Sequence, residues 1–325
     1  MTRRARLKSL AKVNLDLRVL QKRSDGFHEL RTVFQTISLA DTIEIEFETA
    51  RRTKITVEAN VEIPDNLLVR SAQAIFDELG MHARLHFRLK KRIPMGGGMG
   101  GGSSNSAAVL LAVPVLAGRF IPIQKLVEIG ADLGSDVPFF LIGGTAVALG
   151  RGTEIYGVPD ISEEPILAVS PGVHVATGPA YQALGRSLTF TQSSSSINTF
   201  QTFVQALENE RSARVASALS GNDFEAVVFR QHPKLKKIVR RLREVGVAGA
   251  RMTGSGSGIF ALFRTEAERD GAQKVLNGDQ VFRDCGIVPA RLVSRRSYRR
   301  LWHRQLSDHL NPDKRLWPPR SRYVR

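Results

Sequence analysis

A glycine-rich stretch in the first third of the chain has the composition of a phosphate-binding loop. Residues 93–107 read IPMGGGMGGGSSNSA, and six of the 28 glycines of the chain fall within positions 96 to 102. Glycine tolerates positive φ and lets backbone N–H groups approach a ligand, while the first turn of a following helix offers unpaired donors at the positive end of its dipole. Ser103, Ser104 and Asn105 add side-chain donors at that helix start. The stretch predicts a polyphosphate ligand; the competing interpretation is a flexible linker.

Two common nucleotide-binding loops are excluded by the residues around this stretch. The loop does not end in the Gly-Lys-Ser/Thr of a P-loop. A dinucleotide-binding fold requires an acidic residue about 20 positions further on, and residues 116–124 contain none. Lys91 and Arg92 lie just upstream and bring positive charge to the loop, although Arg92 fits a solvated strand end equally well.

Hydrophobic periodicity predicts the elements that position the loop. Alternating apolar residues predict five strands, over 6–20, 32–39, 41–48, 53–59 and 83–93. A helix is predicted over 65–80, with Asp65 or Asn66 as N-cap and Gly80 as its stop, and another over 103–118, weakened or bent at Pro114. The glycine stretch thus joins a strand to an apolar helix, which favours a binding loop over a linker.

The rest of the chain predicts an α+β fold. We expect a helix over 123–134, a loop leading into paired strands over 135–152, and a strand over 165–171. A low-complexity mobile loop over 191–196 and helices over 197–246 follow. The last elements are a glycine stretch flanked by strands over 249–263 and a helix over 265–277. We predict domains over 1–158 and 159–302, followed by a basic C-terminal extension over 303–325.

The composition is that of a globular protein. Hydrophobic residues make up 42% and charged residues 24% of the chain, and no apolar run approaches the roughly 18 to 20 residues that a membrane span needs. The basic N-terminus lacks the features of a secretory signal, and Cys285 is the single cysteine. We therefore expect a cytoplasmic protein with no membrane partner.

More than half of the net charge of +16 lies at the C-terminal end. Residues 291–325 carry 11 Lys and Arg against 2 Asp, a net of +9, which leaves 16 − 9 = +7 for the rest. Because this tail mixes Arg with Trp and Tyr, one interpretation is an RNA-binding protein. The other is an extension, partly helical near 295–307, that packs its tryptophans onto the body. We favour the second because the sequence contains no known nucleic-acid-binding module.

Four motifs in order resemble those of the GHMP kinases, such as galactokinase and the homoserine and mevalonate kinases. The glycine stretch is similar to their ATP-binding loop, and the other three motifs are AKVNL, GSDVPF and TGSGSG at 11–15, 134–139 and 253–258. The resemblance spans roughly residues 8 to 300. It implies a two-domain GHMP kinase fold, with a ribosomal-protein-S5-like N-terminal domain and a C-terminal α/β sandwich-type domain. It also implies an ATP-dependent kinase of a small-molecule alcohol, with ATP and Mg²⁺ as cofactors.

The catalytic residues are predicted from the chemistry of phosphoryl transfer to an alcohol. Such an enzyme holds the phosphoryl group in line with the hydroxyl and gives the hydroxyl proton a base. Asp136 is the predicted base, with a turn-capping aspartate as the alternative. Lys12 lies mid-strand on the same face as Asn14, and an inward lysine needs a negative partner. We predict a Lys12–Asp136 ion pair that keeps the carboxylate ionised and oriented, and the resemblance implies the same pair.

The resemblance also implies the ATP-binding residues. They are the loop and the helix start together with two flanking residues: Pro94, Met95, Gly96, Gly97, Gly98, Met99, Gly100, Gly101, Gly102, Ser103, Ser104, Asn66 and Lys91. Helix capping is the alternative role for Asn66. We predict no cluster of metal-binding side chains; the divalent ion is expected on the phosphate oxygens, with Ser104 as a candidate ligand.

Other motif residues are expected to bind the substrate. Residues 25–30, DGFHEL, resemble a segment whose aromatic residue and histidine bind cytosine, so Phe27 is predicted to stack on the base and His28 to bind its edge. An ordinary surface histidine is the alternative for His28. A looser match predicts Tyr181 as the opposing aromatic and Thr177 as a polar contact. The remaining predicted substrate residues are Asn14, Thr253, Gly254, Ser255 and Gly256, where a hairpin turn is the alternative for the glycine motif.

The expected substrate is therefore a cytidine diphosphate alcohol. The triple-glycine loop is most similar to the branch of the family that phosphorylates the 2-hydroxyl of such an alcohol in the non-mevalonate isoprenoid pathway. The alternatives are a homoserine-type or mevalonate-type kinase, which gains nothing from Phe27 and His28, or an RNA-binding protein that uses the Arg-rich tail. We expect a monomer or a weak homodimer.

Overall fold

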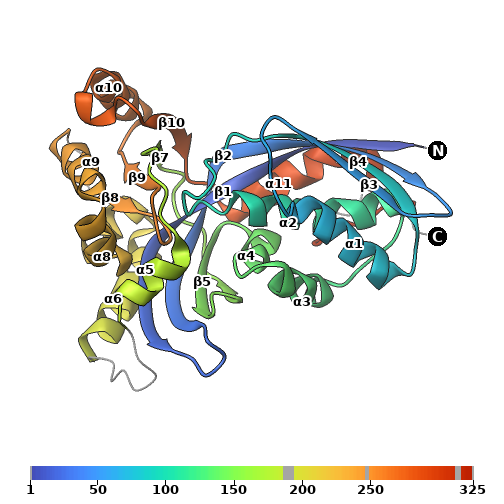
Figure 1. The fold of residues 1–325 in the computed structure, drawn as a ribbon, viewed down its shortest axis with the longest axis horizontal. Helices are drawn as coiled ribbons and strands as arrows, with labels where there is room; N and C mark the ends of the chain where they lie inside the picture. The colour runs from blue at the N-terminus through green and yellow to red at the C-terminus, as the bar shows by residue number, and fades with distance from the viewer. Residues whose placement is uncertain (1, 186–193, 246–248, 312–315, 324–325) are drawn as a thin grey trace.

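Two β-sheets organise the part of the chain that the computed structural model describes, which is residues 2–185, 194–245, 249–311 and 316–323. The first sheet has the order β3-β4-β2-β5-β6, with β1 paired to β2, and the second has the order β10-β7-β9-β8 (Figure 1). Neighbouring strands are antiparallel except for the parallel pair of β3 and β4. The strands are β1 (Arg3–Lys22), β2 (His28–Thr49), β3 (Lys54–Ala59), β4 (Ala83–Lys90), β5 (Thr145–Gly150), β6 (Glu154–Gly157), β7 (Pro165–Ser170), β8 (Gly249–Met252), β9 (Ile259–Leu262) and β10 (Gly286–Arg291).

Helices pack on both sheets, and the predicted α+β fold is confirmed. On the side of the first sheet lie α1 (Leu67–Leu79), α2 (Gly101–Ala117), α3 (Ile123–Leu133), α4 (Val137–Ile142) and α11 (Arg295–Gln305). The helices that accompany the second sheet are α5 (Thr177–Ala183), α6 (Ser194–Glu210), α7 (Ala213–Ala216), α8 (Phe224–Gln231), α9 (Pro233–Glu244) and α10 (Glu266–Asn277). Short 3-10 turns are η1 (Ser217–Leu219), η2 (Gln280–Phe282) and η3 (Ser307–His309).

The strand, loop and helix around the glycine stretch form as predicted. The helix α1 is capped by the side chain of Asn66, whose Oδ1 accepts a hydrogen bond from the Leu68 N–H at 3.0 Å, and it ends at Gly80 in the left-handed conformation. The helix α2 is apolar on all sides and is buried from Ser104 to Leu116. A helix with no polar face must lie inside the protein, so α2 fixes the glycine loop against the core.

Two predicted boundaries are wrong. The strands predicted over 32–39 and 41–48 are one strand, β2, because β1 pairs with it along almost its whole length, from Arg3 opposite Phe47 to Lys22 opposite His28. Asp41, predicted as the first residue of the second of these strands, is fully buried within β2. The segment 135–152, predicted as a loop leading into paired strands, contains the helix α4 before the strand β5. The helix tolerates Pro138 because the first turn of a helix does not need that N–H.

Two further predictions concern single segments. In the low-complexity loop predicted over 191–196, residues 191–193 lie outside the described residues, whereas residues 194–196 begin α6 and so differ from the prediction. The domain division at residue 158 stays a prediction; β6 ends at Gly157 and β7, the next strand, belongs to the second sheet. Within the described residues, no helix combines the length and the apolar composition of a membrane span.

Candidate active site

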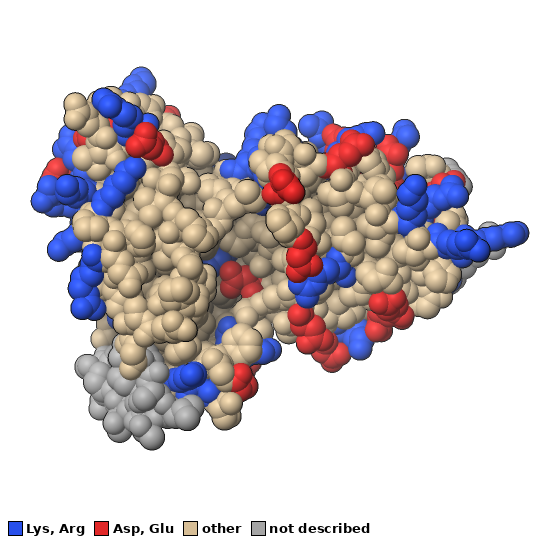
Figure 2. All heavy atoms as spheres, in the orientation of Figure 1, with Lys and Arg blue, Asp and Glu red and all other residues tan. Residues whose placement is uncertain are grey.

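Two cavities meet at the glycine loop. The smaller, of about 360 Å³, is lined by residues 94–103 of the loop together with Asn66 and Lys91. The larger, of about 760 Å³, is lined by Lys12, Asn14, Asp136 and residues from both glycine motifs. Gly98 and Ser103 line both cavities. The space-filling view is hollowed between the sides of the molecule that carry α2–α4 and α5–α6 (Figure 2).

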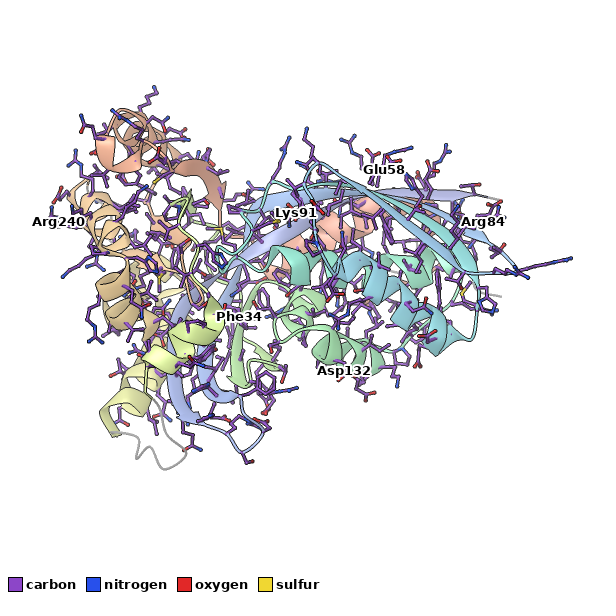
Figure 3. The ribbon with its side chains drawn as sticks, in the orientation of Figure 1. Phe34, Glu58, Arg84, Lys91, Asp132 and Arg240 are labelled. Carbon is purple, nitrogen blue, oxygen red and sulfur yellow. The ribbon has the colours of Figure 1, made fainter. Side chains whose placement is uncertain are left out.

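Asp41 holds the chain that enters the glycine loop. Its Oδ1 accepts hydrogen bonds from the backbone N–H groups of Arg92 and Ile93, at 2.7 and 2.9 Å, and its Oδ2 pairs with the ammonium of Lys91. Lys91 is largely buried, and its Nζ lies beside Gly101, the first residue of α2 (Figure 3). The lysine therefore adds positive charge to the N-terminus of α2, where anions are already favoured.

The two serines at the start of α2 have different environments. Ser103 lines both cavities. Ser104 is only 3% exposed, and its hydroxyl donates to the Leu10 carbonyl at 2.6 Å and accepts from the Ser9 hydroxyl at 2.7 Å. Ser104 does not line either cavity, and its contact with ATP or the metal ion stays a prediction. The other twelve residues predicted for ATP all line the smaller cavity.

Lys12 and Asp136 lie together in the larger cavity. The Lys12 ammonium is 3.3 Å from Asp136 Oδ2, donates to Asn14 Oδ1 at 2.8 Å and lies 4.7 Å from the centre of the Phe34 ring. The lysine side chain is 3% exposed whereas the carboxylate is 31% exposed. The carboxylate thus faces the cavity while the buried lysine supports it from behind.

Asn14 connects the first strand to the C-terminal glycine motif. Its Oδ1 accepts hydrogen bonds from Lys12, from the Thr253 hydroxyl at 3.1 Å and from the Gly254 N–H at 2.9 Å. Thr253 is fully buried. Gly254 and Ser255 line the larger cavity, whereas Thr253 and Gly256 are not among its lining residues. Thr253 thus bridges Asn14 and the glycine motif, and its contact with substrate stays a prediction.

The two glycine motifs touch through their backbones. A Cβ atom at Gly98 would lie 2.3 Å from the Thr253 carbonyl oxygen, and one at Gly258 would lie 2.2 Å from the Gly97 carbonyl oxygen. Such distances leave no space for any side chain at these positions. The close approach explains why both motifs are rich in glycine.

The aromatic residues predicted to hold the nucleobase all line the larger cavity. His28 stacks on Tyr181 with ring centres 4.7 Å apart, and Tyr181 meets Phe224 edge to face. Phe27 is 50% exposed, and the Arg151 guanidinium lies 4.7 Å from its ring centre. The face of Tyr181 expected for a base is therefore covered by His28 in this structure. Thr177 is hydrogen-bonded to Ser255 at 3.0 Å, and both line the cavity.

Burial shifts the pKa values of two of these groups. Desolvation and the nearby charge of Lys22 lower the pKa of His28, so its ring is neutral at pH 7. Desolvation and the charge of Asp136 raise the pKa of Tyr181 to about 12. Both rings are therefore uncharged at neutral pH.

Sequence reasoning missed several cavity residues. Lys22, Arg151 and Phe224 line the larger cavity, and Asp41 anchors the loop behind the smaller one. Lys22 lies close to the DGFHEL motif, which is a usable signal. The other three come from distant segments, and only the fold brings them to the site.

The cavities contain few metal-binding side chains. No group of three or more His, Cys, Asp or Glu lies close enough to hold a metal ion within the described parts of the chain. Asp136 and Asp65 are the acidic residues that line the larger and the smaller cavity respectively.

Comparisons with known proteins agree with this geometry. The chain matches the GHMP kinases N terminal domain over residues 66–144 and the GHMP kinases C terminal domain over residues 203–279. A Solibacter usitatus protein named 4-diphosphocytidyl-2-C-methyl-D-erythritol kinase is 50% identical over 99% of this chain and 98% of its own length. A Geobacter metallireducens protein of the same name is 37% identical over 85% of this chain and 95% of its own length.

Solved structures give the same result. A crystal structure of 4-(cytidine 5'-diphospho)-2C-methyl-D-erythritol kinase is similar with a TM-score of 0.72 and 31% identity, covering 88% of this chain and 98% of that one. Homoserine kinase from Cytophaga hutchinsonii has a TM-score of 0.68 at 15% identity, covering 90% of this chain and 95% of that one, and shares the fold. The protein therefore belongs to the 4-diphosphocytidyl-2-C-methyl-D-erythritol kinase family of the GHMP kinases, which are small-molecule phosphotransferases that use ATP.

Proposed function

We propose that the protein transfers the terminal phosphoryl group of ATP to the 2-hydroxyl of 4-diphosphocytidyl-2-C-methyl-D-erythritol, a reaction of the non-mevalonate isoprenoid pathway. The names of its relatives supply this substrate. The observation that carries the proposal is the Lys12–Asp136 ion pair, which lies in the larger cavity close to where that cavity joins the glycine loop. A phosphoryl donor in one cavity and an alcohol in the other would meet at this pair.

The smaller cavity fits ATP. The left-handed glycines Gly98 and Gly100 keep the backbone free of side chains, and α2 directs its first N–H groups toward the loop. Lys91 adds a cation at the same helix end. Mg²⁺ bound with ATP supplies charge neutralisation at the phosphate oxygens, and Ser103 is the hydroxyl near enough to both cavities to take part.

Asp136 and Lys12 divide the work of the transfer. Asp136 Oδ accepts the proton of the attacking hydroxyl. Lys12 has three N–H donors, of which two are directed at Asn14 and Asp136, so the third is available to a phosphoryl oxygen. The lysine thereby orients the base and stabilises negative charge on the transferred group.

The aromatic and basic residues of the larger cavity distinguish a nucleotide-linked alcohol from a simple one. Phe27 and the stacked pair of His28 and Tyr181 offer aromatic surface to a nucleobase, and Lys22 and Arg151 place positive charge where a diphosphate would pass. Homoserine and mevalonate have no nucleobase, so these aromatic and basic residues favour a cytidine diphosphate alcohol over the alternative substrates. Gly254 and Ser255 add polar groups to the lining, with Ser255 hydrogen-bonded to Thr177 of α5.

An ADP-release assay tests the proposal directly. The purified protein is given ATP, Mg²⁺ and one of three alcohols: 4-diphosphocytidyl-2-C-methyl-D-erythritol, homoserine or mevalonate. We expect ADP release with the first alone, and turnover of homoserine or mevalonate with no turnover of the first would overturn the substrate assignment.

Two substitutions test the catalytic roles. Lys12→Ala and Asp136→Asn should each lower kcat by at least about 100-fold, in the range typical of a lost general base or charge stabiliser. Asp132→Asn is the matched control, because Asp132 is exposed on the neighbouring helix α3 (Figure 3), and it should keep the wild-type rate. Near-normal turnover in either folded site variant would remove that residue from the mechanism.

The RNA-binding alternative is not favoured by the packing of the tail. Trp302 is buried, and Trp317 is half-buried and donates from Nε1 to the Leu141 carbonyl at 2.8 Å, so neither ring is free to stack on bases. The cytoplasmic location and the monomeric or weakly dimeric state stay predictions.

A further inference from the structure

The C-terminal segment, residues 295–311 and 316–323, packs beneath the helix that follows the catalytic aspartate. Neither family match reaches beyond residue 279. Yet the helix α11 lies against the first sheet (Figure 1), and Tyr298, Trp302, Leu306 and Leu310 belong to the same hydrophobic core as α2 and α4. The segment is therefore an integral part of the fold around the site.

Two side chains of this segment hold the end of α4. Tyr298 donates its hydroxyl to the Phe140 carbonyl at 2.5 Å, and Trp317 donates Nε1 to the Leu141 carbonyl at 2.8 Å. The last carbonyls of a helix have no partner within the helix, and α4 is only six residues long, so these two bonds replace what the helix itself cannot provide. Asp136 immediately precedes α4, so the position of this helix sets the position of the carboxylate.

The turn after α4 is held by the same segment. The Arg295 guanidinium donates to the carbonyls of Gly143, Thr145 and Val158, at 3.2, 2.5 and 3.1 Å. A Cβ atom at Gly143 would lie 2.2 Å from the Tyr298 ring. The contact is therefore too close to allow α4 to shift without moving Tyr298.

The helix α4 also contacts the glycine loop and the surroundings of Lys12. The ring of Phe140 lies against Gly100, where an added Cβ would come within 2.8 Å of it, and that same Cβ would be 3.2 Å from the Lys12 side chain. Phe139 packs against Phe34, the ring next to the Lys12 ammonium. Close-packed contacts of this kind transmit displacements, because protein interiors have few voids to absorb them.

We propose that Tyr298 and Trp317 are positioning residues for catalysis, which act through α4 to fix Asp136 against Lys12. The inference rests on the proposed role of Asp136 as the base. The C-terminal segment then contributes to the reaction itself. It supplies two hydrogen bonds that fix the short helix α4 and thereby the orientation of the Asp136 carboxylate. A misplacement of about 1 Å at a reacting group can cost about 100-fold in rate.

Conservative variants of the full-length enzyme test this. Tyr298→Phe and Trp317→Phe each remove one hydrogen bond to α4 and keep an aromatic ring. We expect kcat to fall about tenfold in each, with KM for ATP and for the alcohol changed less than about twofold. Tyr323→Phe is the matched control: it removes a hydroxyl at the other end of the same segment, 3.1 Å from His309, and should leave kcat unchanged.

A second measurement separates positioning from loss of stability. Each variant is combined with Asp136→Asn, and the residual rates are compared in single turnovers. If the two residues act through Asp136, they should not lower the Asp136→Asn rate further, whereas a general weakening of the fold would lower both backgrounds equally. Equal loss in both backgrounds, or unchanged kcat in both single variants, would overturn the inference. If instead Asp136→Asn alone retains near-wild-type turnover, the proposed base is wrong, which is a distinct outcome.

Discussion

The contact between the two glycine motifs allows one prediction to be worked out in detail. Gly98 has a φ of 68°, in the left-handed region, and an added Cβ would lie 2.3 Å from the Thr253 carbonyl oxygen and 3.2 Å from Gly254 Cα. A carbon and an oxygen in contact normally stay about 3.3 Å or more apart. The substitution Gly98→Ala therefore forces the two backbones apart by about 1 Å.

The cost has two parts. An alanine in the left-handed region costs roughly 1–2 kcal/mol, and insertion of a methyl group into packed structure costs about 1–3 kcal/mol more, so the unfolding free energy should fall by about 2–5 kcal/mol. Because Gly98 lines both cavities, the same displacement moves the loop relative to Asn14 and Lys12. A shift of about 1 Å predicts a fall in kcat/KM for ATP of about 100-fold.

Urea unfolding and steady-state kinetics measure the two effects. Gly102→Ala serves as the comparison for stability within the loop, since its nearest contact would be an ordinary 3.5 Å to Leu67 and its φ is not positive, so its unfolding free energy should fall far less. Gly271→Ala in α10 has nothing within 4 Å and should leave activity unchanged. Wild-type stability and kcat/KM in Gly98→Ala would refute the close-approach argument.

Three further predictions follow from buried polar groups. Asn14→Ala removes the acceptor of three donors, including the Lys12 ammonium, and should lower the unfolding free energy by about 2–4 kcal/mol in urea. Asp41→Asn leaves the Lys91 ammonium without its carboxylate and should cost about 3–5 kcal/mol by the same measurement. Because burial lowers the pKa of His28 in the fold, the unfolded chain binds the proton more readily, so wild-type stability should fall more between pH 7 and pH 5 than that of His28→Gln; equal slopes would contradict the assigned shift.

Local patterns were sufficient for elements whose causes lie within a few residues. The N-cap at Asn66, the left-handed stop at Gly80 and the strand–loop–helix around the glycine stretch depend on neighbours in the chain. They failed where a distant partner decides. The break predicted between the strands 32–39 and 41–48 is absent, because pairing with β1 keeps Ala40 and Asp41 within one strand.

The candidate site divides in the same way. The ion pair of Lys12 and Asp136 was predicted because an inward lysine needs an anion, and the motif resemblance pointed to that partner. Ser104 resembled Ser103 in sequence, but the turn of α2 directs its hydroxyl into the core. His28 and Tyr181 were both predicted at the base, while their mutual stacking was not.

By itself, the sequence determined the chemistry of this protein: which backbone lacks side chains, which charges need partners and which family carries these motifs. Only the tertiary structure decided which groups remain available to a ligand, and that the C-terminal segment holds α4. The physical reason is the separation along the chain over which each property is set. Backbone conformation and charge requirements are properties of a residue and its neighbours, whereas burial and contact depend on segments that the chain brings together from more than a hundred residues away.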